Sequence, residues 1–246
     1  MTNLFIFILI SFLFFIFISK ISYKLNLVDI PNKRKIHKIP VAFTGGMAMT
    51  ITFAFSVYLF DFHDVKINLI FSIGFLMALI GLVDDKYNLN IGGKLSLQLI
   101  PVVYLIIIEN FSLIQLGEYE YFKLEFNSFA IPFTLLCVLF LINAYNYFDG
   151  LDGVLTFSSI SVILILFCLV SDENLRLFLV IILISKSIFL LFNFSVFKLP
   201  RLFLGDSGSM LLGFTVAFIL IYLANEKKIE PILLAFSISI FVYEFL

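Results

Sequence analysis

The stretch NAYNYFDGLDG, residues 143–153, concentrates polar side chains in a chain that is otherwise strongly apolar. Asn143 and Asn146 are three residues apart, and so are Asp149 and Asp152. Positions three or four apart share a helix face, so Asn143, Asn146 and either Asp149 or Gly150 are expected to lie together. Two carboxamides and two carboxylates suit a hard metal ion and a hydroxylated or nucleobase ligand. This density of polar groups predicts a binding site rather than a plain loop.

Two further stretches place carboxylates at predicted helix ends. In GLVDDKYNLNIGGK, residues 81–94, Asp84 and Asp85 end an apolar segment side by side. Adjacent carboxylates repel, and a helix C-terminus disfavours negative charge, so the pair indicates a divalent cation or proton transfer rather than a solvated helix end. In GDSGS, Asp206 lies at the head of the next apolar segment, where an anion or a metal–phosphate complex is favoured. Ser207 is disfavoured as a nucleophile because no histidine is placed to activate it.

Basic and glycine residues near these acids are candidates for binding an anionic substrate. The stretch DIPNKRKIHKIPVAFTGG, residues 29–46, is basic and ends in two glycines. Paired glycines at the head of a helix let backbone N–H groups approach a phosphate. A loop that only sets membrane orientation is the alternative interpretation. The predicted substrate-binding residues are Asn143, Asn146, Asp152, Lys35, His37, Gly45, Gly46, Lys86 and Lys198.

The elements that must position these residues are membrane helices. Of the 246 residues, 62% are apolar and 13% are charged, which is about half the charged share of a soluble domain. Apolar runs of about 18 residues recur, and the alternation typical of a membrane barrel is absent. A small hairpin is predicted within residues 110–128. The fold class is therefore an all-α polytopic membrane protein, one domain over residues 1–246. Nine spans are predicted, near 3–19, 45–60, 67–83, 95–109, 129–146, 154–170, 175–193, 208–224 and 230–246.

Lysine and arginine set the predicted orientation. When the loops are assigned alternately to two faces, one face carries ten basic residues and the other carries five. The face with ten is predicted to be cytoplasmic, with the N-terminus outside. This assignment brings all four polar stretches to the cytoplasmic face, where five carboxylates would need a cation. Mg²⁺ takes carboxylate oxygens and keeps positions for phosphate, so the pattern predicts phosphoryl chemistry that joins a soluble substrate to a lipid.

The four stretches, in this order, resemble the polyprenyl-phosphate N-acetylhexosamine-1-phosphate transferases of the glycosyltransferase 4 family, and within it the undecaprenyl-phosphate GlcNAc-1-phosphate transferases. The resemblance implies a multi-pass enzyme of the bacterial cytoplasmic membrane. It implies transfer of a phospho-N-acetylhexosamine, in this branch GlcNAc-1-phosphate, from a UDP-sugar to undecaprenyl phosphate. UMP is the second product, and the reaction starts lipid-linked cell-envelope glycan synthesis.

The same resemblance implies roles for the acidic residues. Asp206 and Asp149 would bind Mg²⁺, and Asp84 and Asp85 would be catalytic residues that serve the lipid phosphate, as a base or as charge partners. Asn146, Asp149 and Asp152 would line the nucleotide–metal site. The lipid bilayer is an expected partner, a homodimer is left open, and nucleic acid is not expected.

The chain also departs from the family pattern that it resembles. Members of that family continue past the ninth span with a cytoplasmic histidine-rich loop and further helices, which are expected to be lacking here because the chain stops at FVYEFL. A truncated, non-catalytic homologue is therefore one alternative. A divalent-cation transporter is another, but the acids fall at helix ends on one face, whereas a transport pathway would distribute them across the bilayer.

Overall fold

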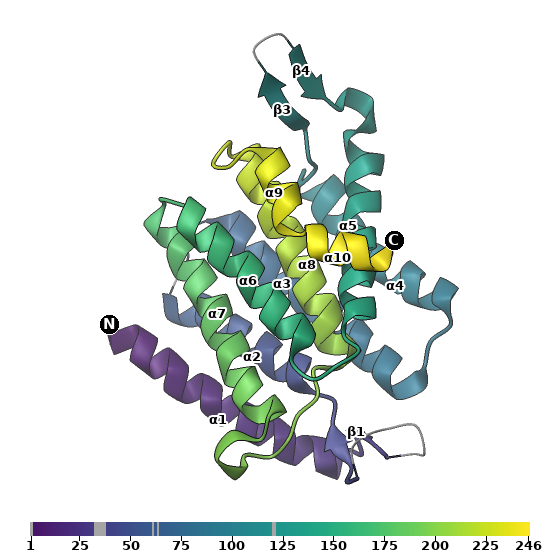
Figure 1. The fold of residues 1–246 in the computed structure, drawn as a ribbon, viewed down its shortest axis with the longest axis vertical. Coiled ribbons are helices and arrows are strands. Elements are labelled where there is room, and N and C mark those ends of the chain that lie inside the picture. The colour runs from purple at the N-terminus through teal and green to yellow at the C-terminus, as the bar shows by residue number, and fades with distance from the viewer. Residues whose placement is uncertain (1, 32–37, 61, 63, 120–121) are drawn as a thin grey trace.

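The computed structural model describes residues 2–31, 38–60, 62, 64–119 and 122–246. Among these residues are ten α-helices and two short antiparallel sheets, and most of the helices run along a common direction (Figure 1). The helices are α1 (Thr2–Lys24), α2 (Gly45–Phe60), α3 (Val65–Tyr87), α4 (Ile91–Val103), α5 (Ala130–Phe148), α6 (Val154–Leu169), α7 (Glu173–Asn193), α8 (Gly205–Asn225), α9 (Pro231–Ser237) and α10 (Ser239–Phe245).

The prediction of nine membrane spans is wrong. Six helices in the described part of the chain are long and apolar enough to cross a bilayer: α1, α3, α4 with its π-helical extension to Ile108, α5 with the 3₁₀ turn before it, α7 and α8. The helices α2 and α6 are also apolar but have only 16 residues each. The ninth predicted span is divided at Ile238 into two helices of seven residues.

A side-chain contact accompanies the break in the ninth predicted span. Ser237 donates its hydroxyl to the Leu234 carbonyl oxygen at 2.7 Å, a contact that bends helices because it competes with the backbone ladder. Ile238 then leaves helical geometry, with φ −104° and ψ 6°. As a result, α10 turns away from α9 and packs against α5, where Phe241 stacks on Tyr145 at 4.0 Å between ring centroids.

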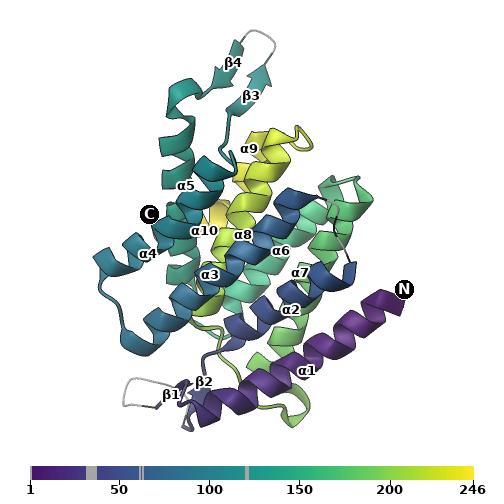
Figure 2. The ribbon, with the colours of Figure 1, turned by 180° about the vertical axis from the view of Figure 1, so that it is seen from behind.

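The centre of the bundle is α8, in which every residue from Ser207 to Ala224 is buried. It packs against α2, α3 and α5, and glycines allow the backbones to approach closely (Figure 2). A Cβ atom added to Gly46 of α2 would lie 2.0 Å from the Gly208 amide nitrogen of α8. One added to Gly81 of α3 would lie 2.4 Å from the Asp206 carbonyl group. These contacts fix the first turn of α8 against α2 and α3.

The short sheets lie at opposite ends of the helix bundle (Figure 1). The predicted hairpin is confirmed by β3 (Gln115–Tyr119), which pairs with β4 (Phe122–Glu125). At the other end, β1 (Val28–Asp29) pairs with β2 (Val41–Ala42), a sheet that the sequence did not predict. The Phe203 amide donates to the Ala42 carbonyl oxygen at 2.8 Å, which ties β2 to the segment that enters α8.

Candidate active site

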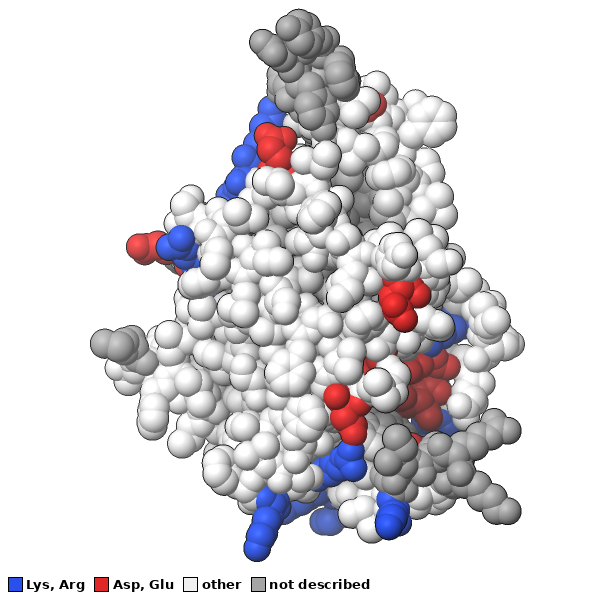
Figure 3. All heavy atoms as spheres, in the orientation of Figure 1, with Lys and Arg blue, Asp and Glu red and all other residues white. Residues whose placement is uncertain are grey.

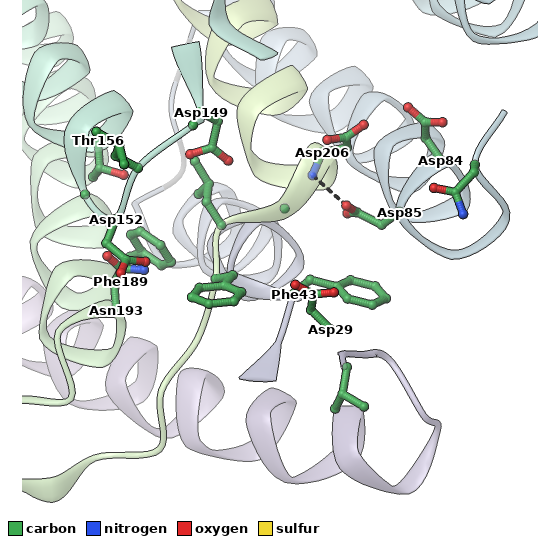
Figure 4. Close-up of a pocket in the computed structure, with 18 of the residues that line it drawn as sticks. Asp29, Phe43, Asp84, Asp85, Asp149, Asp152, Thr156, Phe189, Asn193 and Asp206 are labelled. Carbon is green, nitrogen blue, oxygen red and sulfur yellow. Dashed lines mark hydrogen bonds between the residues drawn. The ribbon is translucent and has the colours of Figure 1, made fainter. Parts of the chain in front are cut away.

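A polar cavity of about 680 Å³ opens where α3 and α5 end and α6 and α8 begin (Figure 4). Residues from all the polar stretches of the sequence line it, although they are separated by up to 177 positions, from Asp29 to Asp206. Six carboxylates therefore meet at one end of the helix bundle, including the five predicted to cluster. They are Asp29, Asp84, Asp85, Asp149, Asp152 and Asp206.

Lys94, in the first turn of α4, connects two of these carboxylates. Its ammonium nitrogen lies 2.6 Å from Asp84 Oδ2 and 2.9 Å from Asp206 Oδ2, and it donates to Asn146 Oδ1 at 2.9 Å. Asn90 begins α4 by accepting the Gly93 N–H at 2.7 Å, which fixes the turn that carries the lysine. The lysine side chain is only 16% exposed, so its charge offsets part of the repulsion among the acids.

Lys94 ends the polar stretch 81–94 but is not among the site residues predicted from the sequence. The polar pattern of residues 81–94 contained it, but the helical turn that begins at Asn90 was needed to aim it at Asp84. Its spacing of ten residues from Asp84 matches no periodic signal within one element.

Asp85 has a structural partner that the sequence did not reveal. Its carboxylate accepts the backbone N–H groups of Asp206 at 3.0 Å and Ser207 at 3.3 Å, in the first turn of α8. A helix N-terminus favours negative charge, which offsets the unfavourable position of Asp85 at the end of α3. The turn is tight, because Gly205 has φ +72° and a Cβ atom there would lie 2.3 Å from the Phe43 carbonyl oxygen.

Asp149, just after α5, differs from its neighbours because its carboxylate has no hydrogen-bond or ion-pair partner among the described residues. Burial raises the pKa of Asp149 to about 7, and the nearby charges of Asp206 and Asp152 raise it in the same direction. The side chain is aimed into the cavity (Figure 4). Asp149 is therefore the carboxylate most available to a cation or a ligand donor.

The other half of the cavity combines aromatic rings with a few polar groups. Phe43, Phe189 and Phe203 line it together with Thr156 and Asn193. The Asn193 amide donates to the Leu202 carbonyl oxygen at 2.9 Å, whereas its Oδ1 atom is buried without a hydrogen-bond partner in the described chain. Such a surface suits a flat ring with polar edges.

Arg201 lies beside the aromatic part of the cavity and contacts two residues that line it. Its guanidinium group pairs with Asp152 and lies 5.3 Å from the centroid of the Phe203 ring. The pair is about one-third exposed, so its contribution to stability is small. Its geometric effect is to hold Asp152 beside the aromatic half of the cavity.

The donors present fit Mg²⁺ held jointly by protein and substrate. Among the described residues, no group of three or more His, Cys, Asp or Glu side chains is arranged to hold a metal ion alone. Mg²⁺ is commonly bound by one or two carboxylates, with water and phosphate oxygens completing six ligands. Asp149 lacks a partner and its charge interacts with that of Asp206, so these two predicted ligands suit such a shared ion.

An apolar groove of about 1100 Å³ adjoins the polar cavity. It lies between α4, α5 and α10, and Lys94 and Asn146 line it at the end near the acids. Asn143 also lines this groove and donates to Gln98 Oε1 at 3.1 Å, so the structure separates it from the acidic cavity. The predicted shared face of α5 is thus divided between the groove and the cavity.

Other predicted substrate-binding residues lie elsewhere. The Gly45 and Gly46 amides donate to the Phe203 and Leu204 carbonyl oxygens at 2.9 and 3.0 Å, so these N–H groups are not free for a phosphate as predicted. Backbone packing explains the glycines instead. Lys86 and Lys198 are exposed and do not line the cavity. Lys35 and His37, in the first loop, fall outside the described residues.

Charged side chains are concentrated at the ends of the molecule. In Figure 3, acidic residues gather near the lower end with basic residues below them, and the broad middle of this face carries few charges. That distribution fits a protein whose middle is surrounded by lipid. Together, the six apolar helices, the acidic cavity at one end and the adjoining groove are the features of a polytopic membrane protein with a polar site next to an apolar one.

The chain belongs to glycosyl transferase family 4, whose profile matches residues 67–224. It is 27% identical over 239 residues to the undecaprenyl-phosphate alpha-N-acetylglucosaminyl 1-phosphate transferase of Escherichia coli O157:H7, covering 94% of this chain and 64% of the relative. It is 29% identical over 209 residues to the probable undecaprenyl-phosphate N-acetylglucosaminyl 1-phosphate transferase of Bacillus subtilis (strain 168), covering 81% and 56%. The resemblance inferred from the motifs is confirmed, and the chain spans less than two thirds of these relatives.

Proposed function

We propose that the protein transfers GlcNAc-1-phosphate, or a related phospho-N-acetylhexosamine, from a UDP-sugar to undecaprenyl phosphate and releases UMP. Family membership and the names of the relatives support this reaction. Starting lipid-linked glycan synthesis at the bacterial cytoplasmic membrane is the corresponding cellular role. The proposal assigns the polar cavity to the nucleotide sugar and the apolar groove to the lipid.

The observation that carries the proposal is the position of Lys94 between the two compartments. Its side chain lines the apolar groove, while its ammonium group contacts Asp84 and Asp206 in the polar cavity. A lipid phosphate whose chain occupies the groove would place its charged end at this lysine. The same ammonium can contact a diphosphate in the cavity, so both reacting phosphates meet at one cation.

The reaction needs two phosphates brought together and their charge offset. An oxygen of the lipid phosphate forms a bond to the sugar-linked phosphorus, the bond from that phosphorus to the bridging oxygen breaks, and UMP leaves with that oxygen. Lys94 orients the attacking phosphate, and the aromatic half of the cavity holds the nucleotide base. When bound by Asp149 and Asp206, Mg²⁺ supplies positive charge that offsets the diphosphate.

The contacts of Asp84 and Asp85 favour one of the two roles predicted for them. Asp84 is held by Lys94 and by the Leu89 N–H at 2.9 Å, and Asp85 is held by the first turn of α8. Both are therefore proposed as charge partners that position Lys94 and α8. This choice between the two predicted roles follows because neither carboxylate is free to approach a substrate proton.

The test is UMP release from UDP-GlcNAc by purified protein with undecaprenyl phosphate and Mg²⁺. We expect release in the unaltered protein and a loss of about 100-fold or more in Asp206→Asn, since removal of a group that stabilises transition-state charge has effects of this size. Asp172→Asn is the matched control. Asp172 caps the start of α7, whereas the cavity is lined by Asn193 at the end of the same helix.

Three outcomes would contradict the proposal. Unchanged turnover in Asp206→Asn would remove this carboxylate from the reaction. Nucleotide binding without turnover in the unaltered protein would favour the non-catalytic homologue. Divalent-cation flux into liposomes in the absence of nucleotide would favour the transporter.

A further inference from the structure

A turn of unusual backbone geometry follows α7, at the same end of the molecule as β1 (Figure 1). Ser195, Phe197 and Lys198 all have left-handed conformations, with φ 51°, 55° and 60°. A positive φ is rare for a bulky side chain, and such outliers are concentrated at functional sites. The ring makes little contact with the rest of the chain, because Phe197 is 88% exposed. The turn therefore directs an aromatic side chain outward.

The helix before the turn places it at a membrane boundary. α7 is long and apolar enough to cross a bilayer, and it ends at Asn193, which lines the acidic cavity. The next residue, Phe194, lies 6.0 Å from Phe157 of α6 between ring centroids, which attaches the start of the turn to the bundle. Phe197 thus follows the end of a candidate span closely, at the depth where aromatic side chains anchor membrane proteins at the lipid–water interface.

The charges near the turn are positive. Residues 1–28, which include α1, and residues 174–205, which include the turn, contain no Asp or Glu. Lys20 and Lys24 of α1 and Lys198 of the turn are exposed, and none of the three is in an ion pair among the described residues. Exposed lysines at the end of a membrane helix attract anionic lipid headgroups.

Packing of α1 against α7 brings these lysines to the same end as the turn. Phe192, one residue before the end of α7, lies 5.4 Å from Phe15 of α1 between ring centroids. Lys20 follows Phe15 by more than one helical turn, toward the same end of the bundle. An exposed aromatic ring and a basic surface are thus combined where α1 and α7 leave the apolar part of the molecule.

We propose that the turn formed by residues 195–198 is a membrane-surface anchor that binds anionic phospholipid. Phe197 inserts among the headgroups, and Lys198 with the lysines of α1 contacts the lipid phosphates. This binding is separate from the proposed reaction. The chain continues from the turn to Arg201, which pairs with Asp152, and to Phe203 in the cavity lining. Lipid bound at the turn therefore restrains the segment that leads into the cavity.

A single fluorescent reporter tests the anchor. The chain contains no tryptophan, so Phe197→Trp places the only indole at the exposed position of the turn. The full chain is reconstituted in nanodiscs of phosphatidylcholine, with or without phosphatidylglycerol. Quenching is compared for acrylamide and for a lipid brominated in the upper part of its acyl chains. We expect the brominated lipid to remove most of the emission, because an interfacial side chain lies about 5–10 Å into the headgroup and acyl boundary.

The matched control is Leu151→Trp, an exposed position at the same end that lines the polar cavity. There acrylamide should be the stronger quencher with either lipid. In Phe197→Trp, phosphatidylglycerol should increase quenching by the brominated lipid and decrease quenching by acrylamide. Adding Lys198→Gln should reduce this effect of phosphatidylglycerol, whereas adding Lys86→Gln, at an exposed lysine near the end of α3, should preserve it.

Two results would overturn the inference. Acrylamide quenching of Phe197→Trp as strong as that of Leu151→Trp, without quenching by the brominated lipid, would show that the turn faces water or a soluble partner. Lipid quenching that is the same with and without phosphatidylglycerol would show that the turn does not select anionic lipid.

Discussion

The carboxylates of the cavity differ in whether the protein itself already satisfies them. Asp84 and Asp206 share Lys94, and Asp85 accepts two backbone N–H groups of α8. Asp149 has no such partner in the described chain, and its pKa is raised to about 7. Asp84 and Asp85 therefore hold the site together, whereas Asp149, next to Asp206, has capacity left for a ligand. The same Asp→Asn substitution should therefore have different effects at different carboxylates of the cavity.

Replacing Lys94 by Met should reduce both stability and activity. The substitution leaves Asp84 buried and close to Asp206 without a cation, and loss of one partner from a buried ion pair costs several kcal/mol. Because Asp206 is one-third exposed, we expect a smaller loss of about 1–3 kcal/mol. Thermal unfolding and UMP release would be measured, with the exposed Lys86→Met as control. Equal unfolding temperatures for the two variants would contradict the bridging role of Lys94.

The raised pKa of Asp149 predicts a pH dependence of the metal-free protein. The folded state binds a proton more tightly than the unfolded state, so the free energy of unfolding should fall as pH rises from about 4 to about 7. Asp149→Asn removes this titration, and its stability should change less over that range. Thermal unfolding in EDTA at several pH values compares the two proteins. A steeper decline in the variant than in the unaltered chain would contradict the assignment.

At the level of elements, the site depends on how closely α8 approaches α2 and α3. The Gly46 and Gly208 backbones touch, and the Gly45 and Gly46 amides donate to the segment that enters α8. This contact places Asp206 within reach of both Asp85 and Lys94. The first loop therefore acts on the cavity through packing, in addition to any contact of its basic residues with a substrate.

Gly46→Ala should destabilise the protein by about 1–3 kcal/mol, because the new methyl group would overlap α8 and backbone shifts in a packed core have costs of this order. Gly92→Ala is the matched control. Both glycines are second residues of a helix, but a Cβ atom at Gly92 would meet only Asn90 Oδ1 at 3.7 Å. Chemical or thermal unfolding in detergent distinguishes them. A Gly46 variant as stable as the Gly92 variant would show that α2 and α8 can separate without cost.

Hydrophobic pattern predicted the order of the elements well and their continuity poorly. It located α1 through α8 and the hairpin, since long apolar runs and a polar interruption are properties of sequence alone. It missed the break at Ile238, because a hydropathy window averages over about 19 residues and the Ser237 hydroxyl contact is a detail of backbone geometry. The sheet of β1 and β2 was missed because each strand has only two residues.

At the level of the whole molecule, the grouping of the five carboxylates was predicted by assigning successive loops alternately to the two faces of the membrane. Three of the nine predicted spans are not among the six candidate spans, namely α2, α6 and the divided last segment, and two of these precede Asp206. The grouping of the acids therefore stands on the cavity and not on the span count. The alternation of loops could not predict which side chains contact one another within the cavity. The contacts of Lys94 with Asp84, of Arg201 with Asp152, and of Asp85 with α8 depend on turns and side-chain rotamers that no periodic pattern records.

The distribution of basic residues between the two ends predicts the orientation of the protein in the membrane. The excess of basic residues at the cavity end predicts that this end faces the cytoplasm. Single cysteines at Lys198 and Lys227, in a chain from which Cys137 and Cys168 are removed, report the two ends of α8. Both positions are exposed and have positive φ, 60° and 51°, so the two substitutions are matched in strain. In intact cells a membrane-impermeant maleimide should label Lys227→Cys and leave Lys198→Cys unlabelled until the membrane is opened. The reverse pattern would place the acidic cavity outside, away from any cytoplasmic nucleotide sugar.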